Sequence, residues 1–346
     1  MTGLGRVLAA LGIALLLGAC AQAPQREPAG AGPAPTVQPL PGRPDPVIAR
    51  NERYVVVVAQ PGDTLAALAQ RWLGEAGRRH VLAEFNRIDE VRAGEPVAIP
   101  LAPGDAKGIG AAGVQAVTIL CYHRFGPKAS SLTVTPQAFE AQMNWLAKNG
   151  YTVVALERLA GFLDGREALP PKAVVITIDD GYRSTYDVAW PVLRKHRFPA
   201  TVFLYTDFVG APDALTWAQM REMAASDLVD VQPHSKTHAN LTIRLPDETE
   251  QRYRERVKRE IEGPIEAIRA QLGARSVAYA FPYGDVNEPI VAELRSRGVA
   301  LGVTVTPGGN AFFAPPYMLR RTMVFGGDDL DAFRAKVVTA LPVGKP

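Results

Sequence analysis

The stretch VVITIDDGYRSTYD, from Val174 to Asp187, begins as an apolar run of mostly β-branched residues and continues into two adjacent carboxylates. Such a run predicts a strand buried on both faces, as in a parallel sheet covered by helices. Asp179 and Asp180 stand where this strand ends, just before Gly181. Because like charges repel and are costly to bury, we expect a cation or solvent to offset their charge. Taken alone, the same residues are also typical of a turn with a helix N-cap.

Strand-like runs and helical patterns alternate on both sides of this stretch, from Val114 onwards. The strand-like runs are QAVTILCYH, TVVAL, AVVITIDD, ATVFLY, VDVQPH, VAYAFPY and ALGVTV. The helical patterns cover residues 136–149, 184–196, 217–225, 247–272 and 288–297. Alternation of this kind predicts an α/β fold with parallel strands and helical crossovers, and about seven units favour an irregular (β/α)7-type barrel over an open sheet. Functional side chains of such folds collect at the carboxyl ends of strands, where His123 and His234 stand as well as the two aspartates.

The stretch PHSKTHANL places His234 and His238 four residues apart. On one helical turn the two imidazoles would share a face and bind one cation. Two histidines and one carboxylate leave coordination positions open for water and substrate, as a catalytic metal site requires. One aspartate would then be the third ligand, and the other would accept a proton from the water that the cation activates. Zinc suits these ligands, and cobalt, nickel or iron also fit them.

Three short motifs, TIDDG, HSKTH and FPYG, occur in this order, and FPATVFLYTDFVG follows the first of them. On these motifs the chain resembles the polysaccharide deacetylase family, also called the NodB-homology or carbohydrate esterase 4 family, over about residues 117–338. The resemblance implies that Asp179 is the general base and that the backbone N–H of Tyr283 helps to hold a tetrahedral oxyanion. The metal ligands that it implies are Asp180, His234 and His238.

The chain departs from the pattern of this family at three places. Ala280 occupies the position where the third motif usually carries an arginine, and either Arg320 or Arg321 could replace it. The usual fourth-motif tryptophan pattern is not visible. No histidine follows His238, so the downstream LxxH general acid of the family is missing. The sequence leaves open which arginine, if either, orients the base.

His123, in LCYHRFG, is the natural replacement for the missing general acid. Its place upstream of the other motifs resembles the branch of the family that deacetylates poly-β-1,6-N-acetylglucosamine. A structural histidine at the end of a strand is the alternative interpretation. Cys121 shares a strand face with His123, which admits a nucleophilic cysteine–histidine pair. A cysteine in the apolar run VTILCYH is, however, typical of an inert, buried core residue.

The N-terminal residues 1–19 predict a secretory signal peptide, with one positive charge followed by a short apolar run. This run is shorter than the roughly 20 residues that a membrane-spanning helix needs. Leu17-Gly18-Ala19-Cys20 resembles a bacterial lipobox, which implies cleavage before Cys20 and lipid attachment to its sulfur. Ala21 rather than aspartate then favours an outer-membrane lipoprotein that faces the periplasm. An ordinary signal peptide with an incidental cysteine is the alternative.

Composition divides the rest of the chain. Residues 20–52 are rich in Pro, Ala and Gly and predict a disordered tether. Residues 53–101 predict a small βααβ domain, with Asp63 or Thr64 as the N-cap of its first helix. Its segments GDTL and GEPVAIP, with Asn86, resemble the LysM module, which implies binding to N-acetylglucosamine-containing glycans such as peptidoglycan; a structural domain without a ligand is the alternative. The remaining predicted segments are a linker at 102–113 and the deacetylase domain at 114–342.

The net charge of +3 is too small to favour a nucleic-acid partner. We therefore expect a lipid-anchored, metal-dependent N-deacetylase that acts on a poly-β-1,6-N-acetylglucosamine-like polysaccharide. A peptidoglycan N-deacetylase is the first alternative, because of the LysM-like segment. A non-catalytic glycan-binding lipoprotein and an O-acetyl esterase with the same metal site are the others.

Overall fold

The structure is a computed structural model that describes residues 47–50, 54–86, 88–101, 109–110 and 113–341. The expected signal peptide, Cys20 and the expected tether up to residue 46 lie outside the described residues, as does most of the expected linker. Within the described part of the chain, no helix is both long enough and apolar enough to cross a bilayer. The lipid anchor therefore stays a prediction.

The small N-terminal domain is an antiparallel sheet with strand order β1-β2-β3, against which two helices pack. Thr64, rather than Asp63, caps the first helix, because its side chain accepts a hydrogen bond from Ala67 N at 3.1 Å. The Asn86 side chain donates to the carbonyls of Leu82 and Ala98 and accepts from Ala98 N, each at 2.8 Å, which ties a helix to a strand. The elements are β1 Val47–Arg50, β2 Tyr54–Val58, α1 Leu65–Leu73, a 3-10 turn Ala76–Arg78, α2 Arg79–Asn86 and β3 Pro96–Pro100.

The expected boundary of the tether at residue 52 needs correction, because Val47–Arg50 is already part of this sheet. Val47 pairs with Val57 and Arg50 pairs with Val55, with a bulge between Val47 and Ala49. The side chains of this strand are mostly exposed, so it has no apolar periodicity that the sequence could reveal. Backbone hydrogen bonds to the edge of a neighbouring strand are enough to order it.

The C-terminal domain is an α/β fold, as predicted, and its main sheet has seven strands among the described residues. Its strands pair in the order β12-β11-β10-β6-β15, with β16 also on β6 and β9 on β10, and only β15 is antiparallel to its neighbour. These strands are β6 Val117–Tyr122, β9 Thr152–Val153, β10 Ala173–Asp180, β11 Ala200–Leu204, β12 Val229–Pro233, β15 Gly309–Asn310 and β16 Thr322–Met323. Every residue of β10 is buried, as its apolar run predicts.

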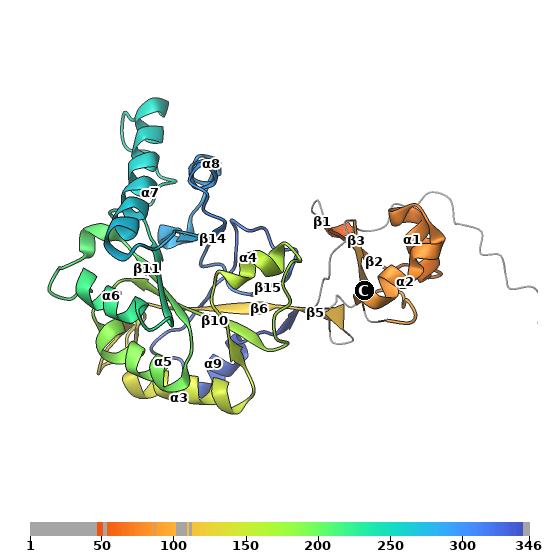
Figure 1. Cartoon of the computed structure of the whole chain (residues 1–346), viewed down its shortest axis with the longest axis horizontal. Coiled ribbons are helices and arrows are strands. Elements are labelled where there is room, and N and C mark those ends of the chain that lie inside the picture. The colour runs from red at the N-terminus through yellow and green to blue at the C-terminus, as the bar shows by residue number, and fades with distance from the viewer. Residues whose placement is uncertain (1–46, 51–53, 87, 102–108, 111–112, 342–346) are drawn as a thin grey trace, which may run out of the picture. The chain divides into compact units, whose positions relative to one another are not determined.

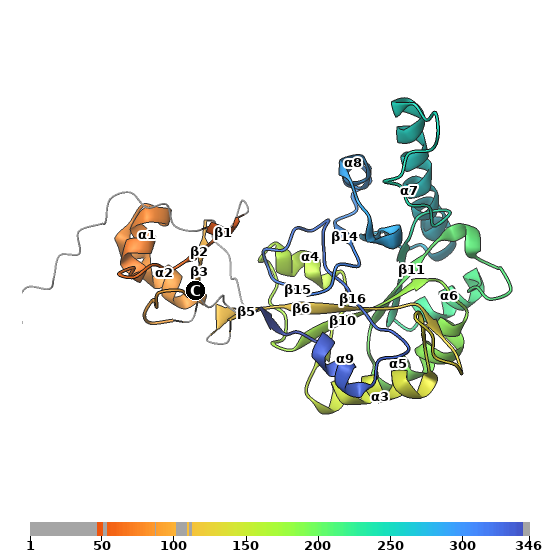
Figure 2. The ribbon, with the colours of Figure 1, turned by 180° about the vertical axis from the view of Figure 1, so that it is seen from behind.

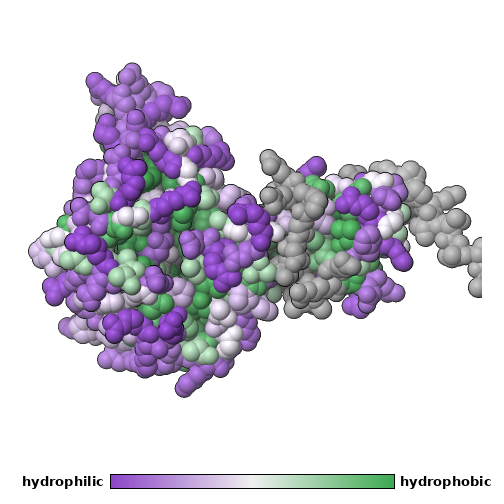
Figure 3. Space-filling model, in the orientation of Figure 1, coloured by the Kyte–Doolittle hydropathy of each residue, from purple (hydrophilic) through white to green (hydrophobic). Residues whose placement is uncertain are grey.

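Helices lie on both sides of this sheet (Figures 1 and 2). Helices α3, α5 and α9 follow one side, and α7 and α8 pack together on the other. The end of α7 that projects from the domain is hydrophilic (Figure 3). The helices are α3 Pro136–Lys148, α4 Arg158–Leu163, α5 Trp190–His196, α6 Trp217–Ala224, α7 Glu250–Leu272, α8 Glu288–Ser296 and α9 Leu330–Lys336.

The predicted helix over residues 184–196 is divided in two. Thr185–Ala189 is a π-helical turn, and α5 begins only at Trp190. Pro191 has no N–H with which to continue the α-helical ladder to Asp187, and the wider turn precedes it. Short strands that the sequence did not predict complete the domain: β4 Ile109–Gly110, β5 Gly113–Gln115, β7 Arg124–Phe125, β8 Thr133–Val134 and β17 Ala340–Leu341.

The strands run around an incomplete ring. β13 (Ala278–Ala280) pairs with β14 (Leu301–Val303), Val303 bridges to Leu319, and the chain then enters β16, which pairs with β6. Between β12 and β13 the Gln232 side chain takes the place of backbone pairing in the described structure. Its Oε1 accepts from Val277 N at 2.8 Å and from Ala278 N at 3.0 Å, and its Nε2 donates to Arg275 O at 3.2 Å.

Candidate active site

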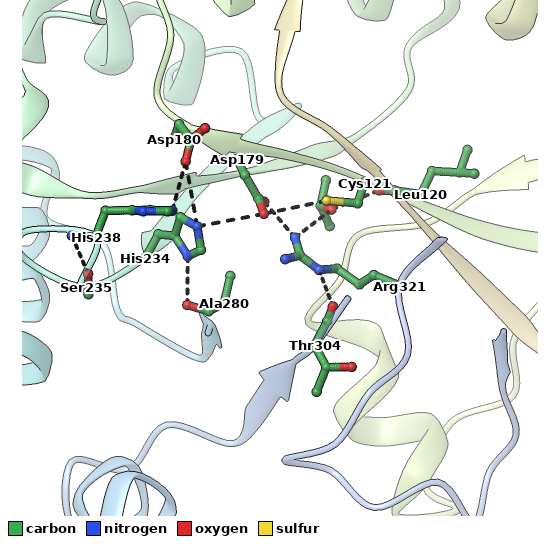
Figure 4. Close-up of polar contacts among 11 residues, drawn as sticks. Leu120, Cys121, Asp179, Asp180, His234, Ser235, His238, Ala280, Thr304 and Arg321 are labelled. Atoms are coloured by element: carbon green, nitrogen blue, oxygen red, sulfur yellow. Dashed lines mark hydrogen bonds and ion pairs between the residues drawn. The ribbon is translucent and has the colours of Figure 1, made fainter. Parts of the chain in front are cut away.

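Asp179 and Asp180 end β10, and the backbone there turns their carboxylates apart (Figure 4). Asp180 has a left-handed φ of 73° and Gly181 a φ of 82°. This left-handed backbone favours glycine at position 181, where a Cβ would also lie 2.4 Å from Leu204 Cδ1. Asp179 consequently faces Arg321, and Asp180 faces the two histidines.

Arg321, not Arg320, replaces the missing arginine of the third motif. Its Nη1 lies 2.6 Å from Asp179 Oδ1, and its Nε donates to Thr304 O at 2.8 Å. The Arg321 side chain is completely buried, whereas Arg320 is exposed and donates to Pro307 O. Burial alone would raise the pKa of Asp179, but the Arg321 guanidinium, with smaller contributions from His234 and His123, holds that pKa well below its usual value. Asp179 is therefore ionised and fixed in orientation.

Asp180, His234 and His238 bring three ligand atoms together within 4.8 Å of one another. Asp180 Oδ1 lies 3.7 Å from His234 Nε2 and 3.4 Å from His238 Nε2. The Nδ1 of His234 is 2.8 Å from Ala280 O, so this nitrogen carries the proton and Nε2 offers a lone pair. Asp180 Oδ1 is buried and has no hydrogen-bond partner among the described residues. These features fit a divalent cation held by two imidazoles and one carboxylate.

Burial shifts the pKa values of the same three residues. Burial raises the pKa of Asp180 to about 6 and lowers that of His234 to about 4. Burial also lowers the pKa of His238. All three shifts favour the uncharged forms, and at Asp180 burial and the charge of Asp179 outweigh the charges of His123 and Arg321. A bound cation would supply further positive charge.

The two histidines do not lie on a helical turn, which corrects one expectation from their spacing. They belong to the loop after β12, in which Ser235 and His238 have left-handed φ values of 69° and 62°. Ser235 Oγ accepts from His238 N at 2.8 Å. This sharp turn, rather than a helix, brings both imidazoles to one point.

A buried carboxylate on α7 holds this loop. Glu260 Oε2 accepts from the backbone N–H groups of Lys236 at 3.1 Å and Thr237 at 2.9 Å, and Oε1 accepts from Thr237 Oγ1 at 2.9 Å. Nothing in the sequence around Glu260 distinguishes it from the other charged residues of α7. Its role depends on a contact across 24 residues, which only the fold reveals.

His123 and Tyr283 stand on either side of this centre. A ring nitrogen of His123 lies within 4.8 Å of both Cys121 Sγ and an Asp179 oxygen, so the end of β6 brings it beside Asp179. Tyr283 has a left-handed φ of 63°, in the turn after β13, and its ring centroid is 4.9 Å from that of His238. Cys121 is fully buried, and burial raises the pKa of its thiol well above the usual value, which argues against a nucleophile. All the predicted site residues that the structure describes therefore meet at one end of the sheet.

Comparison with known proteins gives the family. The model of the polysaccharide deacetylase family matches residues 166–302. YxkH of Bacillus subtilis, which is assigned as a polysaccharide deacetylase, is 30% identical over 219 residues, 63% of this chain and 75% of that protein. The poly-β-1,6-N-acetyl-D-glucosamine N-deacetylase of Escherichia coli is 28% identical over 243 residues, but the chain covers only 36% of its length.

Solved structures agree with this comparison. The Streptococcus pyogenes deacetylase PplD, determined in complex with acetate, has the same fold with a TM-score of 0.58 and 24% identity, and the match covers 64% of this chain and 98% of PplD. The small domain at residues 54–101 takes no part in the family match, which begins at residue 166. The chain therefore belongs to the polysaccharide deacetylase family, carbohydrate esterase family 4, and is a hydrolase of carbon–nitrogen bonds.

Proposed function

We propose that this protein is a metal-dependent N-deacetylase of a polymer of N-acetylglucosamine, of the poly-β-1,6-linked kind. The observation that carries the proposal is the convergence of Asp180, His234 and His238 beside an ionised Asp179. His123, at the end of the neighbouring strand β6, lies beside the same aspartate. The similarity to the E. coli enzyme supports this class of substrate.

Asp180, His234 and His238 are the residues that would hold the cation, for which zinc is the first candidate and cobalt, nickel and iron are the others. When bound, a divalent cation lowers the pKa of water towards about 7 and polarises a carbonyl oxygen. The low pKa of Asp179 keeps it ionised but makes it a weak base. It can therefore accept a proton only from water that is already acidified, which suits its place next to the proposed ligand Asp180.

The remaining steps follow from the places of the side chains. Water adds to the acetyl carbon, and Asp179 accepts its proton through Oδ2, because Oδ1 is held by Arg321. The backbone N–H of Tyr283 donates to the oxyanion that forms. His123 then protonates the sugar nitrogen as the carbon–nitrogen bond breaks. The products are acetate and a polymer that carries a free amine.

The experiment is acetate release by the full chain from poly-N-acetylglucosamine, with and without a chelator. We expect activity that the chelator abolishes and added zinc restores. Acetate release that continues in the chelator would contradict the proposal. Chelator-sensitive release from an O-acetylated glycan, but not from the N-acetylated polymer, would instead identify an O-acetyl esterase.

A second candidate, a peptidoglycan N-deacetylase, is favoured by the LysM-like segments of the small domain. In this domain Asn86 ties the helix to the strand by three hydrogen bonds. Faster release from purified sacculi than from poly-N-acetylglucosamine would favour this candidate. Binding of either glycan without any release of acetate would favour the non-catalytic alternative.

The proposed location is the periplasmic face of the outer membrane, with a lipid on Cys20. The predicted tether suits a polymer-modifying enzyme at that place, because its substrate would lie beyond the membrane surface. Fractionation of cells that express the chain or its Cys20→Ser variant tests this location. The variant should leave the membrane fraction, and equal retention of both proteins would contradict the anchor.

A further inference from the structure

Three side chains that can bind metals meet at the end of β6, next to the Asp180 site. Cys121 Sγ, a nitrogen of His123 and an oxygen of Asp179 lie within 4.8 Å of one another. Cys121 Sγ and Asp179 Oδ2 are 3.5 Å apart. Sulfur and oxygen ligands on one tetrahedral zinc, with bonds of about 2.3 and 2.0 Å, have a separation of about 3.5 Å. The proposed reaction uses Asp179 and His123 but leaves Cys121 without a part.

We propose that Cys121, His123 and Asp179 form a second, inhibitory site for a zinc-like divalent cation. The donors are a sulfur, an imidazole nitrogen and a carboxylate oxygen, the three kinds of ligand that zinc takes from proteins. Arg321 occupies Oδ1 of Asp179, so Oδ2 is the oxygen that faces Cys121. Coordination replaces the S–H bond of Cys121 by a metal–sulfur bond, and the thiol proton leaves to solvent.

The position of this site determines when it fills. Asp179 Oδ2 also lies 3.9 Å from His234 Nε2, so the two cations would be close together and would repel each other. Protein sites with two metals about 3.5–4 Å apart show that two cations can nevertheless bind side by side. Cys121 and Asp179 are almost completely buried, whereas His123 is partly exposed and offers the route of entry. We therefore expect occupancy only when the cation exceeds one equivalent.

Inhibition follows if Asp179 and His123 have the roles given in the proposed function, on which this part of the inference rests. A cation on Asp179 Oδ2 occupies the oxygen that accepts the proton of water. The same cation removes the lone pair or the proton of His123 that the leaving amine needs. Excess metal should therefore stop the reaction without removing the first cation.

The test is a titration of the metal-free full chain with Co²⁺, followed by absorption. Asp180, His234 and His238 offer no sulfur, so a thiolate-to-cobalt charge-transfer band can come only from a cysteine. We expect this band to appear as the second equivalent binds. The Cys121→Ser variant should lack it, and the matched Cys20→Ser variant should keep it. Cys121→Ala is a second variant in case the serine disturbs the buried position, and the thermal unfolding of each variant checks its fold.

Absence of the band at any cobalt concentration would overturn the second site and leave the proposed function intact. A band that saturates with a single bound cation would also overturn it, because Cys121 would then belong to the first site. A band that survives in both Cys121 variants would assign the sulfur to Cys20. That result would also overturn the second site.

Acetate release in the same titration tests inhibition separately. Wild-type activity should rise with the first equivalent and fall as the band grows, and Cys121→Ser should need at least about tenfold more cobalt for the same fall. A Cys121-dependent band without any fall in activity would contradict the inhibitory role. It would also contradict the roles of Asp179 and His123 in the proposed function, while metal binding by the three side chains would stand.

Discussion

At the scale of single residues, Asp179 and Asp180 are neighbours with opposite electrostatic environments. The Arg321 guanidinium lies 2.6 Å from Asp179 and keeps it ionised. Asp180 faces two imidazoles whose pKa values burial has lowered, and its own pKa is raised to about 6. Asp179 thus has a counter-charge in direct contact, whereas at Asp180 burial outweighs the charges of His123 and Arg321.

This contrast predicts how the stability of the metal-free protein depends on pH. The pKa of Asp180 rises from 3.8 to about 6 on folding, so the folded state binds the proton more tightly. This stabilisation is complete below pH 3.8 and is lost as the pH rises through about 6. A shift of two units corresponds to a loss of about 3 kcal/mol.

Asp180→Asn should remove this loss, because the amide does not ionise. Urea unfolding of both metal-free proteins across this pH interval measures the difference. If the stability of both proteins changed equally with pH, the pKa of Asp180 would not be raised on folding, and the prediction would be wrong.

Arg321→Gln should lower kcat/KM by roughly a hundredfold and move the acidic limb of its pH profile upwards. The reason is that burial, once the guanidinium is gone, raises the pKa of Asp179 and protonates the base. The neighbouring exposed residue supplies the matched control, since Arg320→Gln should leave the profile in place. A lower rate with an unshifted acidic limb would mean that Arg321 acts only on the fold.

At the scale of elements, helix α7 supports the loop that carries both histidines. Glu260 accepts three hydrogen bonds from Lys236 and Thr237, within a loop that holds two non-glycine residues at positive φ. Such backbone conformations cost about 1–3 kcal/mol each and persist only where neighbouring groups enforce them. The two histidines of the loop are therefore positioned by a helix that contributes no side chain to the candidate metal site.

Glu260→Gln should weaken zinc binding by about 10- to 100-fold, because an amide cannot accept all three hydrogen bonds with its one oxygen. Competition with a chromophoric chelator measures the affinity directly, without reference to activity. Glu266→Gln, at an exposed position of the same helix, is the control. If the affinity of the Glu260 variant stayed within twofold of wild type, the helix would have no part in positioning the ligands.

The sequence predicts those parts of the fold and site that short segments determine. The buried run of β10 predicts a parallel strand, and the ends of the strands predict where Asp179, His123 and His234 meet. Arg321, by contrast, contacts Asp179 across 142 residues, and no local pattern separates it from Arg320. The strands β15 and β16 have two residues each, too few for periodicity. The conformation of the loop that carries His234 and His238 depends on hydrogen bonds to the distant Glu260. The four-residue spacing of the two histidines does not reveal these bonds and by itself suggests a helical turn.

At the scale of the whole molecule, catalysis and glycan retention are expected in different parts of the chain. The site residues, from Cys121 to Arg321, all lie in the C-terminal domain, and the LysM-like segments lie before residue 102. A substitution at the base should therefore separate the two properties. Such a division suits an enzyme that must stay on an insoluble polymer between successive reactions.

Asp179→Asn in the full chain should abolish acetate release but leave sedimentation with insoluble N-acetylglucosamine polymer unchanged. The exposed Asp331→Asn variant should retain both properties and serves as the control. Loss of sedimentation in the Asp179 variant alone would place glycan retention in the catalytic domain.

The incomplete ring of strands has a consequence for solubility. Gln232 covers the backbone amides of Val277 and Ala278, which would otherwise lie unpaired at the border between β12 and β13. Unpaired strand edges recruit strands from other chains. One glutamine side chain thus satisfies the backbone of this seam, and we expect its replacement by an apolar residue to promote self-association during refolding, when the seam is still exposed.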